Sequence, residues 1–289
     1  MEISHETTLK QPQTNQDSSN MGQPHESLYL VLPYLPLFEL LAMYQVCRSF
    51  MDALNNDILP WLDIVVEDRV RRSRVSDEIL MKITSKAMGR LRSLVLVNCG
   101  KISDDGLQDV VANNHGINKL YVLQCAGLTP EGVIKAVTTL NQQNATLKTL
   151  KINGISNITK EHLQTLRSLL NSDDPSSIDI EICPKCDEPR MVYDCPLETC
   201  DRKRATGSCR GCRFCVTRCE ECGKCVGFDD EDDNEAACED VLCESCWIKL
   251  PKCDFCNKPY CNKHAYKQCD VPGSSHFICE ACYMKIDEV

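Results

Sequence analysis

The sequence predicts a multi-domain protein with a short all-α segment, a short α/β repeat solenoid and a small cysteine-rich domain stabilised by metal. The prediction rests on apolar residues at helical spacing near the N-terminus, a repeated leucine pattern in the middle, and 19 of 22 cysteines between Cys183 and Cys282. We expect a disordered polar tail at 1–23, the helical segment at 24–61 and the repeats at 62–172. A linker at 173–182 then leads to the cysteine-rich domain at 183–289.

Composition excludes several classes of protein. Hydrophobic residues make up 43% and charged residues 26%, which is typical of a globular protein and not of a collagen-like, wholly disordered or multi-span membrane chain. The net charge of −10 argues against non-specific binding of nucleic acid through the overall field.

Two further features concern the compartment. The polar stretch Met1–Gln23 lacks the basic-then-apolar pattern of a secretory signal, so we expect a reducing compartment, the nucleus or the cytoplasm. The segment Leu28–Val46 is mostly apolar, but Pro33, Pro36 and Glu39 make it a poor membrane span.

The helical segment begins at Pro24. Its apolar residues recur every three or four positions, which predicts two or three short amphipathic helices. These residues include Leu37, Leu40, Leu41, Tyr44 and Phe50. An ordinary helical core is one interpretation, but about forty residues are too few to bury so many large side chains alone, so we expect a partner surface.

The stretch PHESLYLVLPYLPLFELLAMYQVCRSF, from Pro24 to Phe50, resembles an F-box. Two prolines stand at the family's spacing and a Val-Cys-Arg element follows, although Gln23 replaces the usual apolar residue and Pro33 interrupts a stretch that is normally helical. The resemblance implies docking to a Skp-type adaptor and, through it, to a cullin. We expect the docking residues to be Leu28, Leu30, Leu32, Leu35, Pro36, Leu40, Val46, Cys47 and Arg48.

The middle of the chain contains an internal repeat. Each copy has four apolar positions, at Leu91, Leu94, Leu96 and Cys99, then Ile117, Leu120, Val122 and Cys125, then Leu147, Leu150, Ile152 and Ile155. The second copy follows the first by 26 residues and the third follows the second by 30, and a partial earlier copy begins at Leu62. The pattern is typical of leucine-rich repeats of the cysteine-containing subtype, whose units must stack because one unit cannot bury its own apolar face.

Each copy continues into a helical pattern. Ser103, Thr129 and Thr159 occupy the positions where helix N-caps are needed. Cys99 and Cys125 are expected to be buried turn residues and not metal ligands. A short array needs capped ends, so the helical segment could cap one end and the cysteine-rich domain the other.

The cysteine-rich domain contains closely spaced pairs that predict metal binding, because one short turn lets two ligands reach the same ion. The pairs are Cys183/Cys186, Cys195/Cys200, Cys209/Cys212, Cys215/Cys219, Cys222/Cys225, Cys243/Cys246, Cys253/Cys256, Cys261/His264 and Cys279/Cys282, with Cys238, Cys269 and His276 as further candidates. We expect four or five structural zinc ions; disulfides would need export.

The pairing of these ligands stays open, with two regularities to guide it. The spacing Cys222-x2-Cys225-x17-Cys243-x2-Cys246 fits a four-cysteine zinc site. The set Cys183, Cys186, Cys209 and Cys212 also recurs 70 residues later as Cys253, Cys256, Cys279 and Cys282, as a duplicated module would.

Two alternative functions fit the sequence of this domain less well. A RING-type ligase needs Cys-x1–3-His-x2–3-Cys, and the nearest match, from Cys261 through His264 to Cys269, has too long a final gap. A nucleic-acid site would use the basic cluster Arg202, Lys203, Arg204, Arg210, Arg213 and Arg218, but an acidic run, Asp229–Asp233, lies close by and nucleic acid is not the expected partner.

The combination looks like a plant-style F-box/leucine-rich-repeat protein. This resemblance implies the substrate-recognition subunit of an SCF-type (Skp, cullin, F-box) ubiquitin ligase, which binds an unknown target protein through the repeats or the zinc domain. Such a subunit is not itself an enzyme, because it acts by holding the target near the conjugating enzyme. The alternatives are a zinc-dependent protein- or nucleic-acid-binding module, or a RING-like ligase.

Overall fold

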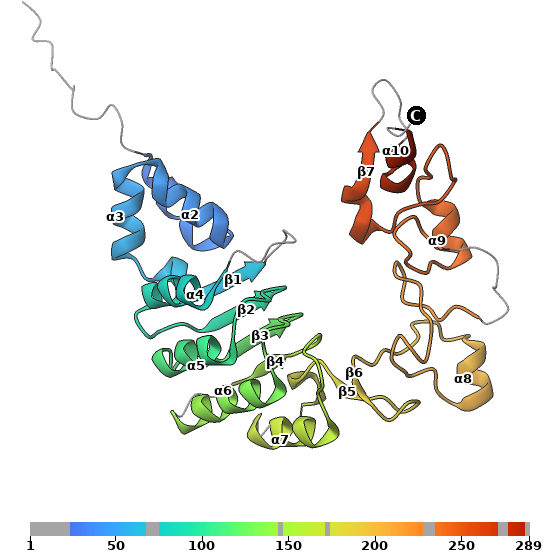
Figure 1. The fold of residues 1–289 in the computed structure, drawn as a ribbon, viewed down its shortest axis with the longest axis horizontal. Coiled ribbons are helices and arrows are strands. Elements are labelled where there is room, and N and C mark those ends of the chain that lie inside the picture. The colour runs from blue at the N-terminus through green and yellow to red at the C-terminus, as the bar shows by residue number, and fades with distance from the viewer. Residues whose placement is uncertain are drawn as a thin grey trace, which may run out of the picture.

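The computed structural model describes residues 24–67, 75–143, 147–170, 174–227, 235–270 and 277–286. The helical segment and the α/β array form one arm of the molecule, and the cysteine-rich part forms the other (Figure 1). Among the described residues, no helix has both the length and the apolar character that a membrane span needs. The predicted polar tail and the acidic run 229–233 lie outside the described residues.

The helical segment consists of short helices, three of which begin at or near a proline. They are α1 (Glu26–Tyr29), the 3₁₀ helices η1 (Leu32–Tyr34) and η2 (Leu59–Trp61), and two longer helices, α2 (Leu37–Val46) and α3 (Arg48–Asn56). Pro33 lies in the first turn of η1, where its fixed φ angle favours a new helix start and its missing N–H is not needed, so α1 stops after four residues. Cys47 is extended and separates α2 from α3.

This segment shares one hydrophobic core with the array. Leu40, Phe50 and Leu54 are buried in the same cluster as the strand residues. The indole Nε1 of Trp61 donates a hydrogen bond to the carbonyl oxygen of Leu54 at 2.8 Å. The helical segment therefore covers the first strand of the array, as a capping element must.

The array is a parallel four-stranded sheet in sequential order, with a helix after each strand (Figure 1). The strands are β1 (Asp63–Glu67), β2 (Ser93–Val97), β3 (Lys119–Leu123) and β4 (Thr149–Lys151). The helices are α4 (Asp77–Thr84), extended by η3 (Ser85–Ala87), α5 (Asp104–Asn113), α6 (Pro130–Gln142) and α7 (Lys160–Leu170).

The register of the sheet agrees with the repeat alignment. Leu94 pairs with Leu120, and Leu120 pairs with Leu150. Ile64 pairs with Leu94, so the partial earlier copy also supplies a strand, β1, and a following helix, α4. Cys99 and Cys125 are fully buried, as expected, and neighbouring Cys99 together with burial raises the pKa of the Cys125 thiol.

Polar contacts at the helix starts join consecutive units. The Thr129 hydroxyl accepts the backbone N–H of Gly132 at 3.0 Å, which makes it the predicted N-cap, and Ser103 does the same for Gly106 at 3.1 Å. The carboxylate of Asp104, from the preceding unit, accepts hydrogen bonds from the N–H and the hydroxyl of Thr129 at 2.9 and 2.6 Å. The first two units thus fix the starts of the helices that follow, since Asp77 contacts Ser103 in the same way.

Residues 178–180 extend the array and are not part of a linker. Ile178 forms a parallel bridge with Leu150, and both Ile178 and Ile180 are buried. The carboxylate of Asp179 accepts the N–H groups of Ile152 and Asn153 at 2.8 and 3.2 Å. The structure therefore moves the boundary that the sequence placed at 173–182, because the alternating sequence here pairs with the last strand, after the single turn η4 (Pro175–Ser177).

The cysteine-rich part has little regular structure. Its elements are the antiparallel pairs β5 (Glu181–Ile182) with β6 (Pro189–Arg190) and β7 (Gln268–Asp270) with β8 (Phe277–Cys279), and the short helices α8 (Asp201–Thr206), α9 (Glu244–Lys249), η5 (Asn262–Lys267) and α10 (Glu280–Ile286). Its buried clusters consist largely of cysteines. Ordinary hydrophobic burial is therefore a minor source of stability in this part.

Candidate metal centres and docking surface

The ligand-type side chains of the cysteine-rich part converge in five groups. Within each group, the candidate ligand atoms all lie within 4.8 Å of one another. We name them the first group (Cys183, Cys186, Cys212, Cys215), the second group (Cys195, Cys200, Cys209, Cys225), the third group (Cys219, Cys222, Cys243, Cys246), the mixed group (Cys238, Asp240, Cys261, His264) and the last group (Cys253, Cys256, Cys279, Cys282).

The sulfur separations fit tetrahedral metal binding. The Sγ atoms of Cys186 and Cys212 lie 3.9 Å apart, those of Cys195 and Cys225 3.7 Å, and those of Cys256 and Cys279 3.7 Å. A tetrahedron with zinc–sulfur bonds of about 2.3 Å has sulfur–sulfur edges of about 3.8 Å. All 22 cysteines are free thiols, so these groups could hold metal ions such as zinc.

One local backbone conformation occurs three times and opens the first, third and last groups. In each copy the N–H of the first cysteine bonds to the carbonyl oxygen five residues later, and the residue after the second cysteine has a positive φ angle. The positive-φ residues are Asp187, Gly223 and Asn257, which are residue types that tolerate this conformation. The sharp turn holds two sulfurs of a C-x2-C pair on the same side.

Backbone donors also favour the thiolate that a metal needs. Burial raises the pKa of the Cys183 thiol, but N–H groups of Cys186, Cys212 and Lys185 outweigh burial and lower it to about 6. The corresponding Cys253 is affected in the same way, with a pKa of about 7. Since zinc binds thiolate and not thiol, these turns are arranged for a cation.

The structure corrects the predicted pairing. Cys225 does not join Cys222 and Cys243, because its Sγ lies 3.4 Å from that of Cys200, in the second group. The predicted duplicated module is also wrong in its second half. The first group is completed by Cys212 and Cys215, and not by Cys209 and Cys212. C-x2-C spacings overlap along this stretch, and only the turn conformation decides which two cysteines form a pair.

The mixed group contains a residue that the sequence analysis missed. The Oδ2 atom of Asp240 lies 2.8 Å from Nδ1 of His264 and 3.1 Å from Sγ of Cys261. The only signal in the sequence is the spacing Cys238-x-Asp240-x2-Cys243, which a search for cysteine and histidine overlooks. Of the remaining predicted ligands, Cys269 lies on β7 outside the five groups, and His276 lies outside the described residues.

The five groups are interlocked along the chain. The ligands of each group begin before those of the preceding group end, in spans 183–215, 195–225, 219–246, 238–264 and 253–282. Neighbouring groups therefore share the same stretches of backbone and cannot be separated into independent small domains.

The predicted basic cluster is paired with acceptors. Arg210 bonds to Glu181 and Asp194, both at 2.6 Å, and Arg218 donates to the carbonyl oxygens of Tyr193 and Cys209. These two side chains stabilise the fold locally: carboxylates neutralise the charge of Arg210, whereas Arg218 is bound by neutral carbonyl oxygens.

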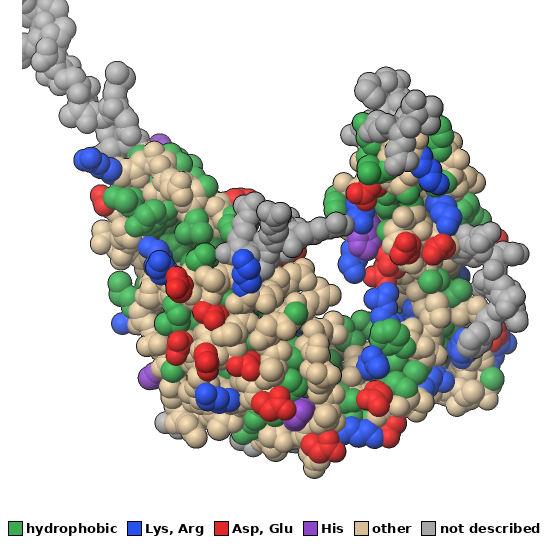
Figure 2. Space-filling view, in the orientation of Figure 1, with side chains coloured by type: hydrophobic (Ala, Val, Ile, Leu, Met, Phe, Trp, Pro, Cys, Tyr) green, Lys and Arg blue, Asp and Glu red, His purple; other side chains and the backbone are tan. Residues whose placement is uncertain are grey.

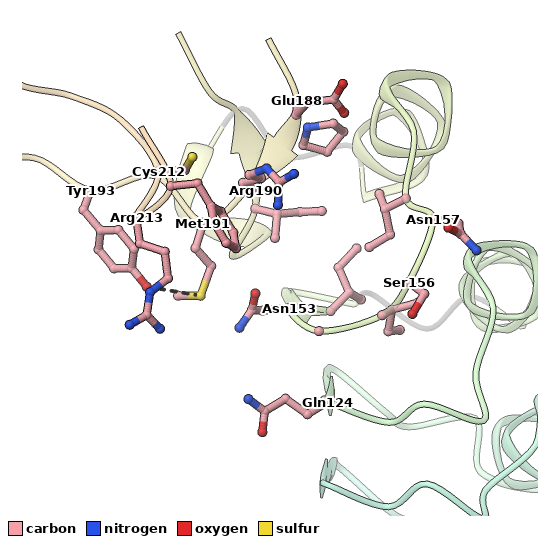
Figure 3. A pocket seen from close by; sticks show the side chains of 17 residues that line it. Gln124, Asn153, Ser156, Asn157, Glu188, Arg190, Met191, Tyr193, Cys212 and Arg213 are labelled. Atoms are coloured by element: carbon pink, nitrogen blue, oxygen red, sulfur yellow. Dashed lines mark hydrogen bonds between the residues drawn. The ribbon is translucent and has the colours of Figure 1, made fainter. Parts of the chain in front are cut away.

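A cavity of about 530 Å³ lies where the array meets the cysteine-rich part. Figure 3 shows Gln124 and Asn153 of the array on one side and Arg190, Met191 and Tyr193 on the other. The Arg190 guanidinium lies 4.6 Å from the ring centroid of Phe214, and the Tyr193 hydroxyl donates to Met191 Sδ at 3.4 Å. The cavity thus offers aromatic, thioether and guanidinium groups to a ligand.

The helical segment leaves a set of apolar side chains exposed, visible as hydrophobic surface at the end of the array arm (Figure 2). The exposed ones are Leu28, Leu30, Val31, Tyr34, Phe38, Val46 and Leu59. Of the predicted docking residues, Pro36 and Arg48 are also exposed, and Leu35 and Cys47 are half-buried.

Two predicted docking residues do not reach this surface. Leu32 and Leu40 are only 3% and 2% exposed, because they form the core beneath it. Tyr34, in contrast, is 85% exposed, and the sequence analysis did not select it.

Comparison with known proteins supports the F-box resemblance. Residues 179–255 match the family described as At3g27290 F-box protein C-terminal domain. The chain is 42% identical to F-box protein SKIP28 of Arabidopsis thaliana over 269 residues, covering 90% of each. It is 34% identical to F-box protein At3g27290 and 31% identical to F-box protein SKIP14 of the same organism, covering 78% and 82% of this chain but 65% and 58% of those relatives. The chain belongs to the family of F-box proteins that these three relatives represent.

Proposed function

We propose that the chain is the substrate-recognition subunit of an SCF-type ubiquitin ligase. Residues 24–61 would dock a Skp-type adaptor and, through it, a cullin, while the array and the cysteine-rich part hold a target protein. The chain would act in the nucleus or cytoplasm by proximity and without covalent chemistry of its own, since holding the target beside the conjugating enzyme makes lysine modification effectively intramolecular.

The observation that carries this proposal is the exposed apolar surface of the helical segment. Leu40, Phe50 and Leu54 are already buried in the core that the segment shares with the array, yet Leu30 and Tyr34 remain largely exposed. Large apolar side chains grouped on a surface mark an interaction site. Membership of the F-box family supports an adaptor as the occupant.

The proposal assigns a structural role to the cysteine-rich part. Zinc ions in the four all-cysteine groups would hold it folded, and the array would be leucine-rich in type. The cavity beside Arg190 and Phe214 lies between these two parts, so both could contribute to target binding.

Co-purification with a Skp-family adaptor tests the docking claim. We expect the wild-type chain to form a stable complex and Leu30→Asp/Tyr34→Asp to lose it, because two charges would be buried at the interface. Ile79→Asp, an exposed apolar position on α4, is the matched control and should still bind. Leu40→Asp is unsuitable because it would unfold the segment.

The melting temperature of each variant shows that the substitutions leave the fold intact. A soluble, zinc-loaded wild type that does not bind the adaptor would overturn the proposal, as would a double variant that binds as well as the wild type.

A second function is favoured by the order of ligands in the third and mixed groups. Along the chain these ligands alternate as Cys219-x2-Cys222, Cys238-x-Asp240, Cys243-x2-Cys246 and Cys261-x2-His264. This is the RING-type spacing considered above, with Asp240 in place of histidine. A RING-like ligase would ubiquitinate itself with a conjugating enzyme in the absence of cullin, whereas a receptor subunit would not.

A further inference from the structure

We propose that Cys238, Asp240, Cys261 and His264 form a fifth metal site, in which the Asp240 carboxylate is a ligand, and that its ion is the first to be removed by a chelator. The inference rests on the zinc-binding part of the proposed function and is independent of adaptor docking.

The geometry of the group indicates one common centre. The Asp240 Oδ2 atom lies within 3.4 Å of Cys238 Sγ, 3.1 Å of Cys261 Sγ and 2.8 Å of His264 Nδ1. The two sulfurs lie 3.7 Å apart, and His264 Nδ1 lies 3.2 Å from Cys261 Sγ. Four donor atoms of different side chains therefore face one another from all sides, which a simple carboxylate–imidazole ion pair does not require.

The burial of the group supports a cation at its centre. The Asp240 side chain is 16% exposed and that of His264 is 24% exposed. A carboxylate beside two thiols and an imidazole, with little water, is stabilised best when a divalent cation balances the negative charges of the ligands. Two sulfurs, one nitrogen and one oxygen form a tetrahedral set that zinc accepts.

The ligands of the mixed group come from two segments of the chain, one before and one after position 255. The residues that match the C-terminal family end at 255, and the first, second and third groups are complete before that point. The mixed group takes two ligands from before position 255 and two from after it. Among the described residues, the side-chain hydrogen bonds that also join these loops are exposed, such as Asn262 Nδ2 to Glu221 at 2.7 Å, and a backbone bond joins the N–H of Ala237 to the carbonyl oxygen of Pro259 at 2.7 Å. The metal would therefore fasten the last group to the rest of the domain.

Ligand chemistry sets the order of release. A carboxylate oxygen is a harder and weaker partner for zinc than a thiolate, and the other four groups each supply four thiolates. A chelator of rising strength should therefore remove one ion per chain before the other four.

The test is metal counting by native mass spectrometry on the purified full chain. We expect five zinc ions in the wild type, four in Asp240→Ala and five again in Asp240→Cys, which restores a fourth ligand. Glu239→Asn removes the neighbouring exposed carboxylate at a positive-φ position and is the matched control, so it should keep five.

Absorption of the cobalt-substituted chain is a second measurement, because it reports the number of thiolate ligands and a folding defect alone would not increase it. In Asp240→Cys the mixed group gains a thiolate, so the thiolate-to-cobalt absorption per chain should rise and the early phase of chelator release should disappear. Five ions in Asp240→Ala, or four in the wild type, would overturn the proposal. Adaptor binding is measured separately, so failure here leaves the docking claim intact.

Discussion

At the scale of single residues, the contact between Asp104 and Gly132 shows how the units of the array fit together. The Asp104 side chain bonds to Thr129 of the next unit, and its carboxylate lies against the α-carbon side of Gly132. A Cβ atom at position 132 would lie 2.0 Å from Asp104 Oδ1. Only glycine leaves room for the carboxylate at this place.

We expect Gly132→Ala to lower the free energy of unfolding by about 1–3 kcal/mol, because the clash displaces Asp104 from its bonds to Thr129. Gly100→Ala is the control, since no atom lies within 4 Å of a Cβ built there. Urea denaturation measures both. Equal midpoints for the two variants would show that the contact adds no stability.

At the scale of elements, helices α5 and α6 of the array each depend on the unit before them. The Asp104 carboxylate on α5 binds the N-cap of α6, and Asp77 on α4 makes the same contact with Ser103 at 2.9 and 2.6 Å. Isolated helices of this length are marginal in water, so a fixed start matters.

The expected effect of Asp104→Ala is a loss of about 1–3 kcal/mol of stability, because the N–H and hydroxyl of Thr129 lose a charged acceptor. Asp105→Ala, the next residue in the same turn, is exposed and makes a matched control with little expected change. Thermal unfolding followed by circular dichroism compares them. A control that falls as far as Asp104→Ala would mean that helix-dipole charge, and not the bridge between units, is responsible.

The elements differ in how well the sequence predicts them. The strand register follows from the spacing of Leu94, Leu120 and Leu150, because buried positions in stacked repeats must align. The metal groups are harder to predict, since Cys222 stands within C-x2-C spacing of both Cys219 and Cys225. Turn conformation chooses between the two, and that depends on backbone hydrogen bonds that residue spacing does not specify.

Residue spacing also does not specify which docking residues lie on the surface. Leucines at helical spacing are correctly expected in the helical segment, but the spacing does not say which of them face inward. Leu40 packs inward, and Tyr34 faces outward because Pro33 ends α1 and redirects the chain. A search confined to cysteine and histidine likewise could not reveal Asp240.

At the scale of the whole molecule, the two arms differ in what stabilises them. One continuous hydrophobic core runs through the helical segment and the array. The cysteine-rich part has only small hydrophobic clusters, and we propose that bound metal supplies most of its stability, at about 10–16 kcal/mol for a structural zinc site. The two tryptophans report on these parts separately, because Trp61 lies in the core and Trp247 lies on α9.

We expect a strong chelator to unfold the cysteine-rich part while the array stays folded. Fluorescence of Trp61→Phe, in which Trp247 is the reporter, should shift to longer wavelength, whereas that of Trp247→Phe should stay nearly constant. Adding zinc back under reducing conditions should reverse the change. A simultaneous shift of both reporters would show that the array depends on the metal as well.

The interlocked order of the groups has a consequence for the growing polypeptide. The groups are completed at Cys215, Cys225, Cys246, His264 and Cys282 in turn, and only the last needs residues beyond His264. A nascent chain could therefore take up its ions one after another as it leaves the ribosome, each ion closing a segment before the thiols of the next are all available. Synthesis from the N-terminus would thus help to exclude wrong pairings among the 22 thiols, a problem that a refolding chain faces all at once.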